Sequence, residues 1–197
     1  STGGKVTIIT VGDANVEPVM RKALAIGADE AVRVNMNATD SFSTATEISN
    51  YIKQNSFDLI IAGRESTDYN GGAVAGMIAE MLDLPFVNAC LGLDVEAGSA
   101  KLIREIDGGK EMISSSLPMV IGGQKGLVQE SELRIPNMRG IMQSRTKPLQ
   151  VLEPSSETKN TSSVSFISPE EKGSCKMVDA SNVAELVDLL HNEAKII

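Results

Sequence analysis

Two loops in the first half of this 197-residue chain carry the residues best suited to bind a ligand. One covers residues 10–13, and the other covers residues 62–72, with the sequence Ala-Gly-Arg-Glu-Ser-Thr-Asp-Tyr-Asn-Gly-Gly. Gly71 and Gly72 stand directly before a helical pattern, so their bare backbone N–H groups can approach an anion with the help of the helix dipole. The second loop is therefore the better candidate for a phosphate-binding site.

The local pattern of this loop leaves two interpretations open. Neither loop matches the dinucleotide fingerprint G-x-G-x-x-G or the nucleoside-triphosphate pattern G-x-x-x-x-G-K-[ST]. A phosphate-binding role fits the paired glycines, and so does an ordinary surface loop that needs them only for a turn.

Other reactive side chains are scarce. His191 is the one histidine, and the helical pattern around it predicts a helix-surface position, so a histidine-based triad or metal site would depend on that residue alone. Four phenylalanines, two tyrosines and no tryptophan supply few surfaces for base stacking. The composition favours a small-molecule or partner binder over a catalyst, and we predict neither catalytic residues nor metal ligands.

The charge balance and the cysteine count narrow the class of protein. The chain has 26 acidic and 18 basic residues, a formal charge of −8 and a pI near 4.8, which argues against nucleic-acid binding. No apolar run approaches the roughly 20 residues that span a bilayer, and the first residues do not form a signal peptide. Two cysteines far apart in sequence, Cys90 and Cys175, fit a reducing compartment. We expect a cytoplasmic protein without direct membrane insertion.

Strand and helix patterns alternate through the first half of the chain. Residues 6–11, 31–34 and 58–63 are predicted as buried strands, and residues 16–26, 43–54 and 74–82 as helices, with Ser43 as a candidate N-cap. This alternation predicts an open, mostly parallel α/β sheet with helices on both faces. Ligands of such sheets bind beyond the carboxyl ends of the strands, where both glycine loops lie.

The second half has a different pattern. Residues 91–115 predict an antiparallel hairpin that turns at Asp107-Gly108-Gly109 and returns at the edge of the sheet, and residues 119–123 predict a further central strand. An irregular, proline-punctuated stretch follows at residues 135–142, then a linker at 153–163 and a terminal helix at about 182–195. We divide the chain into a nucleotide-binding α/β domain, residues 1–133, and a C-terminal arm, residues 134–197.

Four separated segments together resemble the β subunits of electron transfer flavoproteins. They are residues 62–74 with the helix that follows to residue 85, residues 22–29, the run Arg-Glu-Ile-Asp-Gly-Gly at 104–109, and the Lys-Pro-bearing run at 136–148. The resemblance covers the chain from Lys5 onward. Because it joins four motifs in order, it is more specific than any single glycine loop.

The resemblance implies a Rossmann-like fold of the adenine-nucleotide-binding type and an electron-carrier role without catalysis. In that family the β subunit binds AMP structurally and forms a heterodimer with an α subunit that holds most of the redox FAD. Electrons pass from acyl-CoA and related dehydrogenases of fatty acid oxidation to a membrane quinone reductase. Two alternatives stay open: a bifurcating variant with a second FAD in the AMP site, and a free-standing adenine-nucleotide-binding module.

The resemblance also implies two sets of site residues. The nucleotide set follows the first strand and fills the glycine loop: Val11, Gly63, Asp68, Asn70, Gly71, Gly72, Ala73 and Val74. Many members have Thr-Gly-Gln where this chain has Gly71-Gly72-Ala73, so backbone N–H groups would hold more of the phosphate. The partner-recognition set, with Met138 as an adaptable apolar anchor, is Arg134, Pro136, Met138, Ile141 and Met142. The alternative is that Met138 and Met142 only cover the core.

The start of the chain departs from the family pattern. Family members begin with another strand, a loop and a helix, whereas this sequence opens at what resembles the second strand. We therefore expect an N-terminally shortened form whose sheet lacks a central strand. Such a form should be less stable and bind the nucleotide more weakly, so that added AMP produces little rise in melting temperature.

Overall fold

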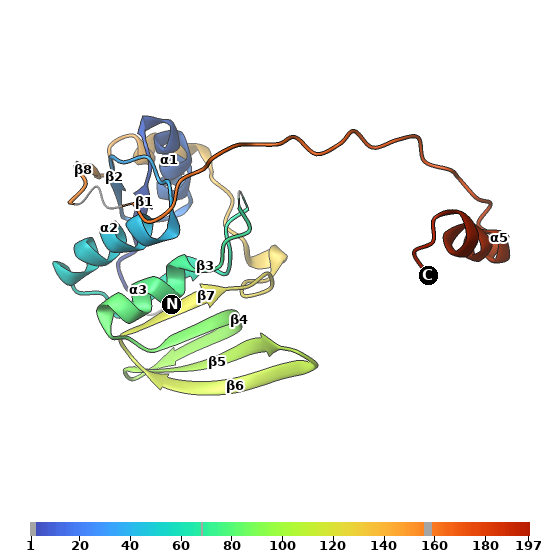
Figure 1. Cartoon of the computed structure of the whole chain (residues 1–197). Coiled ribbons are helices and arrows are strands. Elements are labelled where there is room, and N and C mark those ends of the chain that lie inside the picture. Colours follow the sequence, from blue (N-terminus) through green and yellow to red (C-terminus); the bar gives the residue numbers. More distant parts are fainter. Residues whose placement is uncertain (1–2, 68, 156–158) are drawn as a thin grey trace. The chain divides into compact units, whose positions relative to one another are not determined.

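The computed structural model describes residues 3–67, 69–155 and 159–197. The chain divides into two compact units, a body from Ser1 to Ser163 and a C-terminal unit from Val164 to Ile197 (Figure 1). The predicted nucleotide loop and the predicted partner-recognition residues belong to the body. The second unit contains the terminal helix.

The predicted alternation of strands and helices is confirmed in the first half of the body. The elements are β1 (Thr7–Val11), α1 (Glu17–Ile26), β2 (Glu30–Val34), α2 (Ser41–Lys53), β3 (Leu59–Gly63) and α3 (Val74–Leu82), with a 3₁₀ turn at Ala14–Val16. The predicted N-cap Ser43 is wrong, because the Asp40 carboxylate accepts the Ser43 backbone N–H at 2.7 Å and α2 begins at Ser41.

The second half of the body forms an antiparallel meander and one more parallel strand. The elements are β4 (Phe86–Glu96), β5 (Ser99–Ile106), β6 (Gly109–Ser116) and β7 (Met119–Gly123). As predicted, β6 lies at the edge of its sheet and β7 is central, between β3 and β4. β4 begins before the predicted hairpin: it first pairs in parallel with β7, passes through a register shift between Val87 and Cys90, and then turns into the antiparallel ladder with β5.

The strands form two sheets with the orders β1-β2-β8 and β3-β7-β4-β5-β6. The expected open α/β class is confirmed, with parallel pairing in the first sheet and mixed pairing in the second. Within the described residues, no strand pairs with the second edge of β1 or of β3. Ile61 of β3 is 61% exposed, although parallel strands are normally buried on both faces. β1 and β3 are therefore edge strands of their sheets within the described residues.

The two sheets share a helical layer. α2 packs against α3 and β1, while α3 also packs against β7 and β4 (Figure 1). The buried cluster between them is rich in alanine, which allows the two helices to approach closely. Its members are Ala45, Ile52, Ala75, Ile78, Ala79 and Val120.

The stretch at residues 135–142, predicted to be irregular, is partly helical instead. α4 (Met138–Ser144) is capped by Asn137, whose side chain accepts the Gly140 N–H at 2.7 Å. A strand that the sequence analysis missed, β8 (Leu149–Leu152), then pairs in parallel with β2. Both elements are too short to carry a clear periodic signal. The first part of the predicted arm is therefore packed within the body.

Two basic side chains fix α4 to α1. Arg21 donates to the backbone carbonyl oxygens of Ser144 and Lys147 at 2.7 and 2.8 Å. Lys147 donates in return to the carbonyl oxygens of Leu24 and Ala28 at 2.9 and 2.5 Å. Arg21 thus caps the carboxyl end of α4, and Lys147, which follows α4, caps the carboxyl end of α1, where carbonyl groups lack helical partners.

The C-terminal unit contains α5 (Val183–Asp188), capped by Asn182 and continued by a π-helical turn at Leu189–Glu193. This agrees with the predicted terminal helix. His191 is exposed, and its ring Nδ1 lies 2.9 Å from the Ile197 carbonyl oxygen. A search of the described ranges finds no helix that could span a membrane and no group of three or more acidic, histidine or cysteine side chains placed to hold a metal ion.

Replacing Gly140 by alanine tests the packing of α4 on α1. Alanine normally favours a helix over glycine, but a Cβ at position 140 would collide with the Ala25 backbone carbonyl oxygen. We expect Gly140→Ala to lower the free energy of unfolding by about 1–3 kcal/mol in a denaturant titration. Gly109→Ala is the control because its Cβ would meet open space. If the two variants had the same free energy of unfolding, the close packing of α4 on α1 at Gly140 would be wrong.

Candidate functional site

The candidate nucleotide site lies at the carboxyl end of β3. Gly63 is the last residue of β3, and the backbone N–H of Arg64 extends the parallel pairing by donating to the Gly123 carbonyl oxygen at 3.1 Å. Val11 is the last residue of β1 and is buried, so it lies at the carboxyl end of the other sheet. The structure therefore separates the predicted nucleotide residues into one loop and one residue on a neighbouring sheet.

The loop closes on itself before it enters α3. The Ser66 N–H donates to the Gly71 carbonyl oxygen at 2.9 Å, and the Gly71 N–H donates to Ser66 Oγ at 3.3 Å. Asn70 adopts a left-handed conformation with φ of 53°, which asparagine tolerates better than most residues. Asp68, a predicted site residue, lies outside the described residues.

The amino end of α3 directly follows Gly71 and Gly72. Ala73 is its N-cap, and within the described residues it makes no side-chain capping bond. α1 likewise has no side-chain cap at Val16, whereas α2, α4 and α5 are capped by Asp40, Asn137 and Asn182. The first-turn N–H groups of a helix have no intrahelical acceptor, so those of α3 need a partner from elsewhere. The predicted residues Gly71, Gly72, Ala73 and Val74 are thus brought together at an uncapped helix end.

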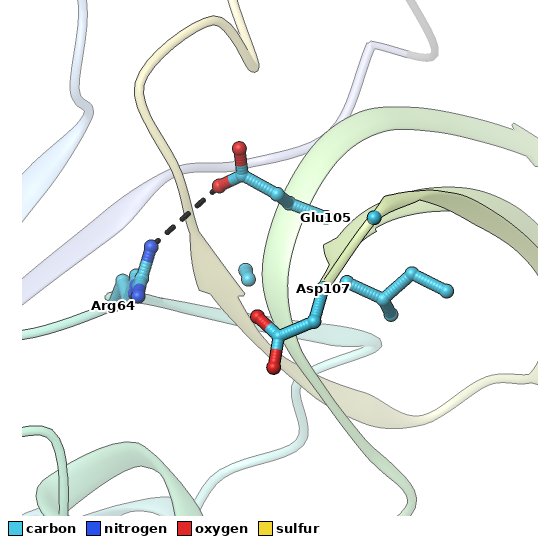
Figure 2. A pocket seen from close by; sticks show the side chains of 6 residues that line it. Arg64, Glu105 and Asp107 are labelled. Carbon is cyan, nitrogen blue, oxygen red and sulfur yellow. Dashed lines mark ion pairs between the residues drawn. The ribbon is translucent and has the colours of Figure 1, made fainter.

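A charged cavity of about 230 Å³ adjoins the start of this loop (Figure 2). It is lined by Arg64, Ala89, Glu105, Ile106, Asp107 and Gly108. The Arg64 guanidinium lies 3.6 Å from Glu105 Oε2, which also accepts a 2.7 Å hydrogen bond from Gln124 Nε2. Ala89, in the irregular part of β4, has a left-handed φ of 52°. The cavity therefore combines one cation and two carboxylates at the sheet edge that carries the loop.

Sequence reasoning did not assign Arg64, Glu105 or Asp107 to a site. The sequence did contain a signal for this pair. Glu105 and Asp107 are two residues apart at the end of a predicted strand, and residues with this spacing lie on the same face of a strand. The approach of the hairpin end to Arg64 depends on how β4 bends from β7 into the meander. That bend could not be derived from local sequence.

Three of the predicted partner-recognition residues, Met138, Ile141 and Met142, form the outer side of α4. Met138 and Met142 are 74% and 67% exposed, and Ile141, on the same helical face, is exposed as well. Gly140 and the buried Ser144 occupy the side toward α1. Because both methionines are exposed, they do not cover the core of the body, as the alternative interpretation expected. Arg134 reaches back toward Gly27, and Pro136 is half-buried.

An exposed isoleucine beside this surface was missed from the sequence. Ile135 is 84% exposed and directly precedes Pro136. The only sequence signal was an apolar residue among prolines and basic residues. Together with Met138, Ile141 and Met142 it makes an apolar group that we call the α4 surface.

Comparison with known proteins points to one family. The family described as "Electron transfer flavoprotein domain" matches residues 1–157. The electron transfer flavoprotein subunit beta of Bacillus subtilis (strain 168) is 34% identical over 210 residues, which cover 99% of this chain and 80% of that protein. The subunit of the same name from Syntrophomonas wolfei is 30% identical over 98% of this chain and 77% of its own length. The one from Mycobacterium tuberculosis is 35% identical over 76% of this chain and 56% of its own length. The chain therefore belongs to the electron transfer flavoprotein family, as a chain of the β-subunit type.

Proposed function

We propose that this chain binds AMP at the amino end of α3 and acts as the β half of a heterodimer whose α subunit holds the redox FAD. The observation that carries the proposal is the uncapped amino end of α3, reached through two glycines in a chain of this family. The donors there are backbone N–H groups aligned with the helix dipole, a set that suits a phosphate.

The residues of the loop favour a phosphate held by backbone rather than by side chains. Gly71, Gly72 and Ala73 carry no side-chain donors. The absence of side chains on the two glycines also lets a ligand approach the backbone closely. A Cβ at Gly72 would lie 3.4 Å from the Arg64 carbonyl oxygen, so this segment already runs close to the start of the loop.

In this proposal the chain's own residues bind AMP and orient the partner proteins, and the flavin supplies the redox chemistry. Electrons come from acyl-CoA or related dehydrogenases and go to a quinone reductase. The α4 surface, with Arg134 and Pro136, docks the dehydrogenase. Methionine is flexible and polarisable, so Met138 and Met142 suit a surface that meets several partners.

Replacing Ala73 by aspartate tests the nucleotide site. A carboxylate at the N-cap stabilises the helix but repels a phosphate from the same N–H groups, so melting temperature and nucleotide binding should separate. We expect the unmodified chain, incubated with AMP, ATP and FAD, to retain AMP that mild acid releases and mass spectrometry identifies. The Ala73→Asp variant should retain at least about tenfold less AMP than the unmodified chain. A tenfold loss corresponds to about 1.4 kcal/mol of binding free energy.

The matched control is Ala73→Ser, which offers a helix cap without a charge and should retain more AMP than the aspartate variant. Retention of FAD instead would indicate the bifurcating variant, and retention of ATP would indicate a free-standing module. Either result, or equal retention by the aspartate and serine variants, contradicts AMP binding at this helix end.

Replacing Met138 by glutamate tests the α4 surface. A charge at a docking anchor costs desolvation free energy, so we expect electron transfer from a reduced acyl-CoA dehydrogenase to the assembled heterodimer to slow by about tenfold or more. The exposed position implies an unchanged melting temperature. Met112→Glu is the control, because Met112 is exposed to a similar extent, 83% against 74%, on the edge strand β6 of the other sheet. Equal rates for the two variants would rule out Met138 as the anchor.

A further inference from the structure

The glycine loop contains a chemically labile pair, Asn70-Gly71. Of all the asparagines in the sequence, Asn70 alone is followed by glycine. Asparagine is a thermally labile residue, because the backbone nitrogen of the next residue can attack its side-chain amide. Glycine has no Cβ to shield that nitrogen, so the attack meets less steric resistance here than at any other asparagine of the chain.

The structure leaves the Asn70 side chain exposed and free to react. Within the described ranges, no hydrogen bond holds its amide. Asn137 and Asn182, by contrast, use their side chains to cap α4 and α5. A Cβ at Gly71 would meet Ser66 Oγ at 3.5 Å, which is an ordinary contact, and no other atom of the described residues within 4 Å. The space beside the Gly71 backbone is therefore open.

Two hydrogen bonds to Ser66 oppose the reaction. The Gly71 N–H donates to Ser66 Oγ at 3.3 Å, and the Gly71 carbonyl oxygen accepts the Ser66 N–H at 2.9 Å. The reaction consumes the Gly71 N–H and twists the backbone at Asn70, so the loop must open locally before it reacts. The bond to Ser66 Oγ is long, and the opening of an exposed loop costs little free energy.

The reaction needs no co-reactant other than water. The Gly71 backbone nitrogen forms a bond to Asn70 Cγ, the Cγ–Nδ2 bond breaks, and Nδ2 leaves as ammonia with the hydrogen from the Gly71 nitrogen. The product is a five-membered succinimide ring. Water opens the ring at Cγ to give aspartate, or at the backbone carbonyl carbon to give isoaspartate. Nothing is oxidised or reduced, and either product has a carboxylate in place of a neutral amide.

We propose that Asn70-Gly71 is a site of spontaneous deamidation, and that its acidic product weakens phosphate binding at the amino end of α3. The second half rests on the proposed function above. Asn70 lies three residues before Ala73, the N-cap of α3. A carboxylate this close to the helix end competes with a phosphate for the same N–H groups and repels it. The isoaspartate product also lengthens the backbone by one methylene, which disturbs the pairing of Gly71 with Ser66.

The proposal also links the reaction to the state of the site. A nucleotide held by the loop stabilises the closed conformation, because it binds that conformation and not the open one. Deamidation should therefore be confined to chains whose loop is empty. Once modified, such a chain no longer competes for the nucleotide.

The first experiment measures the rate at each asparagine. The full chain is incubated without nucleotide at mildly alkaline pH, digested with trypsin at intervals and analysed by mass spectrometry, with isoaspartate detected by enzymatic methylation. We expect Asn70 to convert at least about tenfold faster than Asn37. Asn37 is the matched reference, because it is exposed and, among the described residues, also lacks a side-chain hydrogen bond, but it is followed by alanine.

Two variants test the roles of the neighbours. Gly71→Ala should slow the conversion of Asn70 to the rate of Asn37, since the added Cβ fits beside Ser66 and shields the nitrogen. Ser66→Ala should speed the conversion several-fold, because the side-chain bond that opposes it is lost. Equal rates for Asn70 and Asn37 in the unmodified chain, or an unchanged rate in Gly71→Ala, would overturn the modification site.

Asn70→Asp tests the consequence, because it carries the aspartate product from the start. We expect it to retain several-fold less AMP than the unmodified chain, measured by release with mild acid. Asn55→Asp is the control, since it adds the same charge at an exposed position before β3, whereas the loop follows β3. Excess AMP should slow the conversion of Asn70 in the unmodified chain and leave that of Asn37 unchanged.

The outcomes separate this inference from the proposed function. Fast conversion of Asn70 with equal AMP retention by the Asn70→Asp and Asn55→Asp variants would overturn the consequence for binding. Conversion that excess AMP does not slow would overturn the link to an empty loop. If the unmodified chain retains no AMP, the proposed function fails together with that consequence, and the rates without nucleotide still decide whether the modification site exists. Fast conversion, weaker retention and protection by AMP together support the whole inference.

Discussion

The contact between α2 and α3 is the one on which the rest of the body depends. Within the described residues, no strand of one sheet pairs with a strand of the other. The two sheets are instead connected through the helices, because α2 packs on β1 of the first sheet and α3 packs on β7 and β4 of the second. Alanines at 45, 75 and 79 let the helix axes approach, and the buried Ile52, Ile78 and Val120 complete the contact. Each helix then carries a different feature at its amino end: the predicted nucleotide loop before α3, and Asp40 with its bonds to Asn160 and Thr161 before α2.

The difference between these two helix ends follows from their N-cap residues. Asp40 supplies its own acceptor and has a second oxygen left for the chain that returns from β8. Ala73 supplies none, and the two glycines before it leave the N–H groups accessible. A helix end without a side-chain cap needs an acceptor from outside, which a phosphate provides. The two ends also differ in backbone conformation, because Asp40 is extended and Ala73 is already helical.

Much of this fold was accessible from sequence, for physical reasons that can be named. The β-branched run at residues 6–11 and the apolar run at 58–63 both end in glycine-containing loops, and α3 matches its predicted bounds. α4 and β8 were missed because they are short and are stabilised by distant partners such as Arg21, Lys147 and β2. The glycine loop was found from local pattern. The burial of Glu47 was not, because its partner Ser155 lies 108 residues away in sequence.

The most direct test of the central claim is assembly with a flavin-bearing partner. The chain is mixed at micromolar concentration with the cognate FAD-loaded α subunit and run on a size-exclusion column with light scattering and flavin absorbance. We expect a single yellow peak with the mass of a heterodimer. A colourless peak of the chain alone, eluting apart from an unchanged α subunit, would contradict it.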